Sequence, residues 1–225
     1  MEWRDTHNPN VCNEKYQNNK AWGCGTIEEE LKLDHEINWE KFYRTKIKIY
    51  RTSGNYDVLN LTVPETLLDN GLSTLTRGMH VEVGGQLRSY NKILENGRSH
   101  LEVSLFVTSL NILSKEDYEE AEDANLIYLD GYVCKPPTYR ITPFGREITD
   151  IMLKVNRAYG KTDYIPCIAW SRFAKYASVL NNGDRIELYG RFQSREYFKR
   201  VAPDSEIGET KVAYEVSVLK MKKKN

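Results

Sequence analysis

Residues 162–197 read TDYIPCIAWSRFAKYASVLNNGDRIELYGRFQSREY, and this stretch decides the fold. RIELYG (185–190) alternates apolar and polar residues with the period of a half-buried strand. Before it, apolar residues recur at three- and four-residue spacing on one helical face: Phe173, Tyr176, Ala177 and Leu180. Ser171 is a suitable N-cap for that helix. The stretch predicts a strand, a short helix, a turn and a second strand.

The same order of elements occurs in the first half of the chain. FYRTKIKIYR (42–51), YDVLNLTVP (56–64) and MHVEVGG (79–85) correspond to segments of the second half. Offsets of 106 and 105 residues superimpose identical residues: Gly25 with Gly131, Arg51 with Arg157, Asp57 with Asp163, Gly78 with Gly183 and Gly85 with Gly190. We interpret this as an internal repeat.

Each repeat predicts five strands with a helix between the third and the fourth, which is the order of the OB-fold barrel. We therefore expect an all-β protein with two tandem OB-fold units and one short helix in each. The expected organisation is a poorly ordered arm (1–20), a degenerate, acidic first unit (21–113), an acidic linker (114–126) and a basic second unit (127–225).

The chain has no net charge, but the charge is unevenly distributed. Residues 1–130 hold 14 Lys and Arg against 22 Asp and Glu, whereas residues 131–225 hold 18 against 10. This split favours polyanion binding by the second half. Attraction between the two halves is the alternative explanation.

The composition argues against several classes of function. No apolar run approaches the length of a membrane span, and the first residues lack a secretory signal pattern, so we expect a cytoplasmic protein. The four cysteines have no CxxC spacing, which favours reduced, mostly buried thiols over a zinc site. Histidines and carboxylates show no ligand-like spacing. We predict no enzyme activity, no metal and no cofactor.

Aromatic residues of the second half fall beside Arg and Lys along the strands that should form one open face. Single-stranded nucleic acid needs this mixture, because bases stack on flat rings and cations neutralise phosphates. A protein that reads duplex DNA more often presents a basic recognition helix.

At these residues the second half resembles the bacterial single-stranded DNA-binding protein (SSB) family, in its tandem OB-fold form. YRITPFGREITDIMLKVNR (139–157) resembles the first hairpin and second strand of the family, and residues 162–197 resemble its third strand, helix and fourth strand. The resemblance covers about 90 residues. The first half fits the same template mainly through its alignment with the second.

The resemblance implies roles for residues of the second unit. It places base-stacking rings at Tyr159, Tyr164, Trp170 and Tyr197. It places phosphate contacts at Arg157, Lys161, Arg172, Arg191, Arg195, Lys199 and Arg200. Each ring could instead be a core residue, and any single arginine could be an ordinary surface charge. We expect Phe192 to lie in the core.

The first unit departs from this pattern, with Val58 in place of Tyr164 and Pro64 in place of Trp170. We expect it to bind nucleic acid weakly or to act as a scaffold. The sequence ends in VLKMKKKN, without the acidic tail through which SSBs recruit partners. Family members assemble four OB units, so the resemblance implies a homodimer.

Two functions remain open from sequence. The first is sequence-tolerant single-stranded DNA binding in replication, recombination or repair, with a nucleoid-associated location and with replication or repair proteins as partners. The alternative is an OB-fold protein-interaction module of the replication-restart (primosomal) type, with secondary nucleic-acid binding. RNA is not excluded as a ligand, because an OB face contacts bases and backbone in both nucleic acids.

Overall fold

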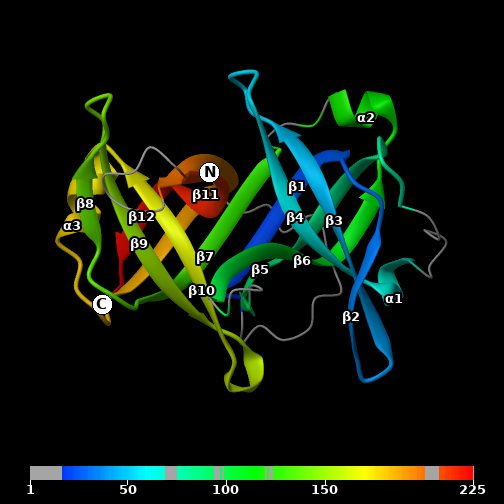
Figure 1. The fold of residues 1–225 in the computed structure, drawn as a ribbon, viewed down its shortest axis with the longest axis horizontal. Coiled ribbons are helices and arrows are strands. Elements are labelled where there is room, and N and C mark those ends of the chain that lie inside the picture. Colours follow the sequence, from blue (N-terminus) through cyan, green and yellow to red (C-terminus); the bar gives the residue numbers. More distant parts are fainter. Residues whose placement is uncertain are drawn as a thin grey trace.

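The computed structural model describes residues 17–68, 75–93, 97, 99–119, 121, 124–200 and 208–224. Two barrels lie side by side in it and share one twelve-stranded sheet (Figure 1). Within the described residues no helix is long and apolar enough to cross a membrane.

Both units follow the same order of elements. The first contains β1 (Asn19–Ile27), β2 (Lys32–Ile37), β3 (Glu40–Tyr50), β4 (Tyr56–Pro64), α1 (Glu65–Leu68), β5 (His80–Ile93) and β6 (Ser99–Ile112). The helix α2 (Lys115–Glu119) follows it. The second contains β7 (Asn125–Val133), β8 (Thr138–Ile141), β9 (Glu147–Asn156), a 3₁₀ turn (Ala158–Gly160), β10 (Thr162–Trp170), α3 (Arg172–Ser178), β11 (Arg185–Arg200) and β12 (Gly208–Lys223).

The strand pairing confirms the prediction of two OB-fold barrels. The sheet order is β2-β3-β4-β6-β5-β1-β7-β11-β12-β10-β9-β8, and the pairs β3–β1 and β7–β9 close the two barrels. The third and fifth strands of each unit run parallel, as β4–β6 and β10–β12. Each unit also has an outer hairpin strand, β2 or β8, in addition to the five predicted strands. These strands pair on one side and are mostly exposed, so their sequences lack a half-buried alternation.

The repeated glycines have a packing reason. A Cβ atom on Gly25 would lie 2.4 Å from the carbonyl oxygen of Lys48, and one on Gly131 would lie 2.5 Å from that of Lys154. At both places the first strand crosses the second strand of its own barrel, and the backbones approach too closely for a side chain. Phe192 is buried, as predicted, in the continuous apolar core of both units.

The predicted helix after Ser171 is present with Ser171 at its N-cap, but capping by the serine side chain and burial of Tyr176 were wrong. Ser171 holds the N-cap position with a positive φ of 50° and makes no side-chain capping hydrogen bond. Its backbone oxygen accepts from the N–H of Ala174 instead. Tyr176 is exposed, and its hydroxyl accepts a hydrogen bond from the N–H of Lys223. The rest of the predicted face is confirmed: Ala177 and Leu180 are buried, and Phe173 packs against the core.

The two units join through their first strands. β1 pairs antiparallel with β7, with Ala21 opposite Ile127, and the two strands lie side by side at the centre of Figure 1. Ala21 and Ile127 are equivalent in the repeat, so a pseudo-two-fold axis passes between them. This pairing covers edges that two separate barrels would expose.

The repeat is symmetric in its side-chain contacts as well. Asn19 donates to the backbone oxygen of Leu87 and accepts from its N–H, at 2.7 and 3.0 Å. Asn125 makes the same pair of bonds to Phe192, at 2.6 and 2.9 Å. Each asparagine thus fixes the fourth strand of its own barrel beside the first.

The described cysteines Cys24, Cys134 and Cys167 are free thiols, and two of them are buried. Burial raises the pKa of Cys24 to about 11. The prediction of mostly buried, reduced thiols holds for these three, and Cys12 lies outside the described residues. The predicted domain boundaries remain predictions, with α2 inside the predicted linker.

Candidate nucleic-acid interface

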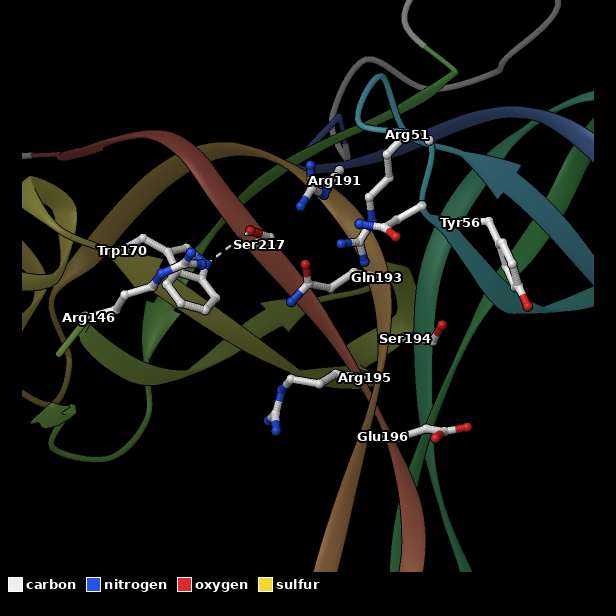
Figure 2. A pocket seen from close by; sticks show the side chains of 12 residues that line it. Arg51, Tyr56, Arg146, Trp170, Arg191, Gln193, Ser194, Arg195, Glu196 and Ser217 are labelled. Carbon is white, nitrogen blue, oxygen red and sulfur yellow. Dashed lines mark hydrogen bonds between the residues drawn. The ribbon is translucent and has the colours of Figure 1, made fainter. Parts of the chain in front are cut away.

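A groove of about 730 Å³ lies between the two units, and we call it the Trp170 groove (Figure 2). Its residues come from the β3–β4 hairpin of the first unit and from the loop before β9, the end of β10, β11 and β12 of the second. They are Arg51, Gly54, Asn55, Tyr56, Arg146, Trp170, Arg191, Gln193, Ser194, Arg195, Glu196 and Ser217.

The β3–β4 hairpin reaches the second unit through a tight turn. The N–H of Arg51 donates to the backbone oxygen of Asn55 at 2.7 Å, and Gly54 adopts a φ of 83° that favours glycine. Tyr56 follows this turn and is 54% exposed. The turn therefore places a charged group and a ring of the first unit beside β11.

Two of the four groove arginines are held by buried carboxylates. Arg51 donates to both oxygens of Asp57, a carboxylate that is 1% exposed. Arg195 donates to both oxygens of Glu215, at 3.1 and 3.3 Å. These hydrogen bonds raise the pKa of each guanidinium above its usual value. The pairing fixes the positions of the two cations but balances their charge.

The other two arginines have no such partner among the described residues. Nε of Arg191 is buried without a hydrogen-bond partner, and burial together with the like charge of Arg51 lowers its pKa. An arginine remains charged despite such a shift. Arg146 is exposed and forms no ion pair with a described carboxylate. Arg146 and Arg191 therefore give the groove positive charge that is free to meet phosphate.

Two predicted stacking residues lie on the same face of β10. Tyr164 is 44% exposed, and Trp170 is half-buried in the groove, where its indole N–H donates to Oγ of Ser217 at 3.2 Å. They are six residues apart, so about 20 Å of extended strand separates them. The backbone N–H of Tyr164 donates to Oγ of Ser89 in the first unit, at 2.7 Å.

The remaining predicted residues lie outside the Trp170 groove. The Arg195 guanidinium lies over the Tyr197 ring, with 5.9 Å between them, and Arg172 lies over Phe173. Arg157 is paired with the buried carboxylate of Asp163, and Lys161 is exposed. The side chains of Tyr159, Lys199 and Arg200 lie outside what the structure describes. All of these sites stay predictions.

The structure thus brings together Trp170, Arg191 and Arg195 from the predicted set. It adds Arg51, Tyr56 and Arg146, which the sequence did not place beside Trp170. The offset of 106 residues marks Arg51 as the repeat counterpart of Arg157, but no sequence signal shows that its hairpin crosses to the other barrel. Within the described residues, no group of three His, Cys, Asp or Glu could hold a metal ion.

The fold and the groove define a tandem OB-fold protein with a cationic, aromatic groove between its barrels. Residues 124–223 match the model of the Single-strand binding protein family. The second unit is therefore similar to that family, and the predicted resemblance to its tandem form is confirmed.

Individual relatives show the same similarity. A single-stranded DNA-binding protein of Thermus thermophilus is 28% identical over 131 residues, covering 52% of this chain and 49% of that protein. Single-stranded DNA-binding protein 1 of Staphylococcus aureus is 34% identical over 80 residues, covering 32% and 48%. The chain thus spans about half the length of the curated relatives it matches.

A solved structure resembles nearly the whole chain. The crystal structure of the wild-type single-stranded DNA binding protein from Thermus aquaticus has a TM-score of 0.69, with 19% identity. The similarity covers 92% of this chain and 93% of that one. At this identity it supports the tandem OB-fold architecture.

Proposed function

We propose that this protein binds single-stranded DNA without strong sequence preference and has no catalytic step. The observation that carries the proposal is the Trp170 groove, in a chain whose residues 124–223 match the model of the Single-strand binding protein family. We further propose that it acts in replication, recombination or repair, in the cytoplasm and on the nucleoid.

The chemistry of the groove favours single strands over duplexes. The ring of Trp170 offers a stacking surface that is independent of base identity, and such stacking contributes about 1–3 kcal/mol per base. Arg146 and Arg191 neutralise phosphates, which releases counterions and makes affinity fall as salt rises. A paired base cannot reach the ring without unstacking.

The test is fluorescence anisotropy with a labelled oligo-dT of about 35 nucleotides and a duplex of equal length, at two salt concentrations. We expect tighter binding to the single strand, weakening with salt, and a loss of at least ten-fold in a Tyr164→Ala/Trp170→Ala variant. Equal affinity for both nucleic acids would contradict the proposal. An unlabelled oligo-rU competitor measures the preference for DNA over RNA.

A matched control separates stacking from general damage. Trp39 is 92% exposed at the tip of the β2–β3 hairpin and does not line the groove, so Trp39→Ala should bind like the wild type. Trp170→Phe keeps a ring but loses the hydrogen bond to Ser217, and we expect it to retain most of the affinity. Thermal unfolding of each variant reports whether it is folded.

We also propose a homodimer, which would supply four OB units. Because β1 and β7 pair within one chain, these strands are not available to join two chains. The dimer would therefore use another surface. Light scattering gives the mass in solution, and a value close to the chain mass of 26.2 kDa would show a monomer.

A further inference from the structure

The pseudo-two-fold axis relates the Trp170 groove to a second surface. On one side the β3–β4 hairpin lies against β11, and on the other the turn between β9 and β10 lies against β5. We call this second region the Pro64 surface, after the residue equivalent to Trp170. If the two regions were alike, the chain would have two equivalent nucleic-acid sites.

The side chains at equivalent positions differ in the property that matters for binding. Arg51 has an arginine as its counterpart, Arg157, but four other groove residues do not keep their type on the Pro64 surface: Trp170 corresponds to Pro64, Arg146 to Glu40, Arg191 to Gln86 and Arg195 to Tyr90. At these four positions the Pro64 surface lacks three cations and one indole ring, and has a proline, a carboxylate, an amide and a tyrosine in their place.

Two cations of the Pro64 surface replace neutral residues of the Trp170 groove: exposed Lys161 replaces Asn55, and Arg88, which is already occupied, replaces Gln193. Gln86 pairs with Phe106 in the β5–β6 ladder, as Arg191 pairs with Ser217 in the β11–β12 ladder, so Phe106 takes the place of Ser217. The guanidinium of Arg88 lies 3.7 Å from the centroid of the Phe106 ring and covers it. This stacking removes both a ring and a cation from contact with a passing strand.

The hairpins also differ. Tyr56, at the start of β4, corresponds to Thr162 at the start of β10. Two neighbours orient the Tyr56 ring. Nζ of Lys48 lies 5.2 Å from its centroid, and the Tyr50 ring meets it in an edge-to-face arrangement with 5.8 Å between the two centroids. It remains 54% exposed and lines the Trp170 groove. The first unit thus carries an oriented ring and the fixed guanidinium group of Arg51 into the site of the second.

We infer that the nucleic-acid site is composite and single: the first unit supplies Tyr56 and Arg51 to the Trp170 groove, and the Pro64 surface takes no part. The inference rests on the proposed function. It gives the acidic first unit a direct role in binding, although that unit lacks the aromatic pattern of the second.

The test compares three single variants in the labelled oligo-dT assay. Tyr56→Ala should weaken binding about five- to ten-fold, as expected for the loss of one stacked base. Tyr56→Phe should retain the wild-type affinity. Tyr90→Ala is the matched control, because Tyr90 is 41% exposed and holds the position of Arg195 on the Pro64 surface; we expect no change in affinity.

Photocrosslinking gives a readout that does not depend on affinity. An oligo-dT that carries 5-iododeoxyuridine should crosslink to Tyr56 and Trp170, identified by mass spectrometry, and not to Tyr90. If Tyr164→Ala/Trp170→Ala loses binding while Tyr56→Ala does not, the composite site is wrong and the proposed function stands. If Tyr90→Ala weakens binding as much as Tyr56→Ala, the single site is wrong. A wild-type protein that does not bind the oligonucleotide overturns both.

Discussion

The backbone N–H of Ser194 donates a hydrogen bond of 3.0 Å to Oδ1 of Asp57, although the two residues lie 137 positions apart. The equivalent bond joins the first unit to the second: the backbone N–H of Ser89 donates to Oδ1 of Asp163 at 2.6 Å. The serine hydroxyls accept in return from the N–H groups of Val58 and Tyr164. Each barrel therefore holds the fourth strand of the other, and the Asp57–Ser194 half of this exchange lies at the Trp170 groove, which Ser194 lines.

We predict that Asp57→Asn lowers the free energy of unfolding by about 3 kcal/mol. The Asp57 carboxylate is buried, and its loss leaves Arg51 without its partner. The expected loss of stability lies at the lower end of the range for a broken buried ion pair, because Arg51 retains some contact with water. Urea unfolding followed by tryptophan fluorescence measures the change. Glu116→Gln, at an exposed position of α2, is the control and should be neutral.

Gly25→Ala should destabilise the first barrel by roughly 2–3 kcal/mol, because its Cβ would overlap the carbonyl oxygen of Lys48 and the backbones must separate. Gly54→Ala meets no neighbouring atom and suffers only from its φ of 83°, at about 1 kcal/mol. Thermal unfolding of both variants checks the order. An equal loss in the two would show that close packing at Gly25 is not the cause of its conservation between the repeats.

The stability of the second barrel should depend on pH through Asp130. Burial alone would raise the pKa of Asp130, but hydrogen bonds from Arg185 and Lys224 outweigh it and lower the pKa below 3.8. A carboxyl with a lowered pKa stabilises the fold above its unfolded pKa, and this contribution disappears as the pH falls through the folded pKa. Asp130→Asn should therefore lose roughly 1–3 kcal/mol near neutral pH.

The pH profile separates this contribution from other effects of the substitution. The difference in unfolding free energy between wild type and Asp130→Asn should be constant above about pH 5 and shrink below about pH 4. Urea unfolding across this range measures it. A difference that stays constant down to acid pH would mean that the charge of Asp130 is not responsible.

Glu196→Gln should tighten binding to oligo-dT about two- to three-fold at low salt, because Glu196 is the one carboxylate that lines the Trp170 groove and it repels phosphate. The gain should vanish at high salt, where screening removes the repulsion. Glu119→Gln, an exposed carboxylate of α2, should leave the affinity unchanged. A gain that persists at high salt would point to a contact other than charge repulsion.

Much of the fold could be predicted because its signals are local. The alternation of RIELYG reflects the period of a half-buried strand, and the repeated glycines mark equivalent positions in the two halves. Both barrels were predicted from these signals. The outer strand β2 was missed because an exposed strand carries no burial pattern, whereas β8 forms, with β9, the first hairpin that the family resemblance had placed at residues 139–157. Capping by the Ser171 side chain was wrong because the turn after β10 imposes a positive φ that the sequence does not reveal.

The sequence by itself determined the two barrels, the buried position of Phe192 and the excess of positive charge in the second half, because apolar period and composition are properties of the chain alone. Only the tertiary structure decided that β1 pairs with β7 and that Tyr56 and Arg51 lie beside Trp170. Backbone hydrogen bonds join β1 to β7, and such bonds do not depend on the type of residue. The geometry of two barrels about their axis then determines which hairpin enters which groove.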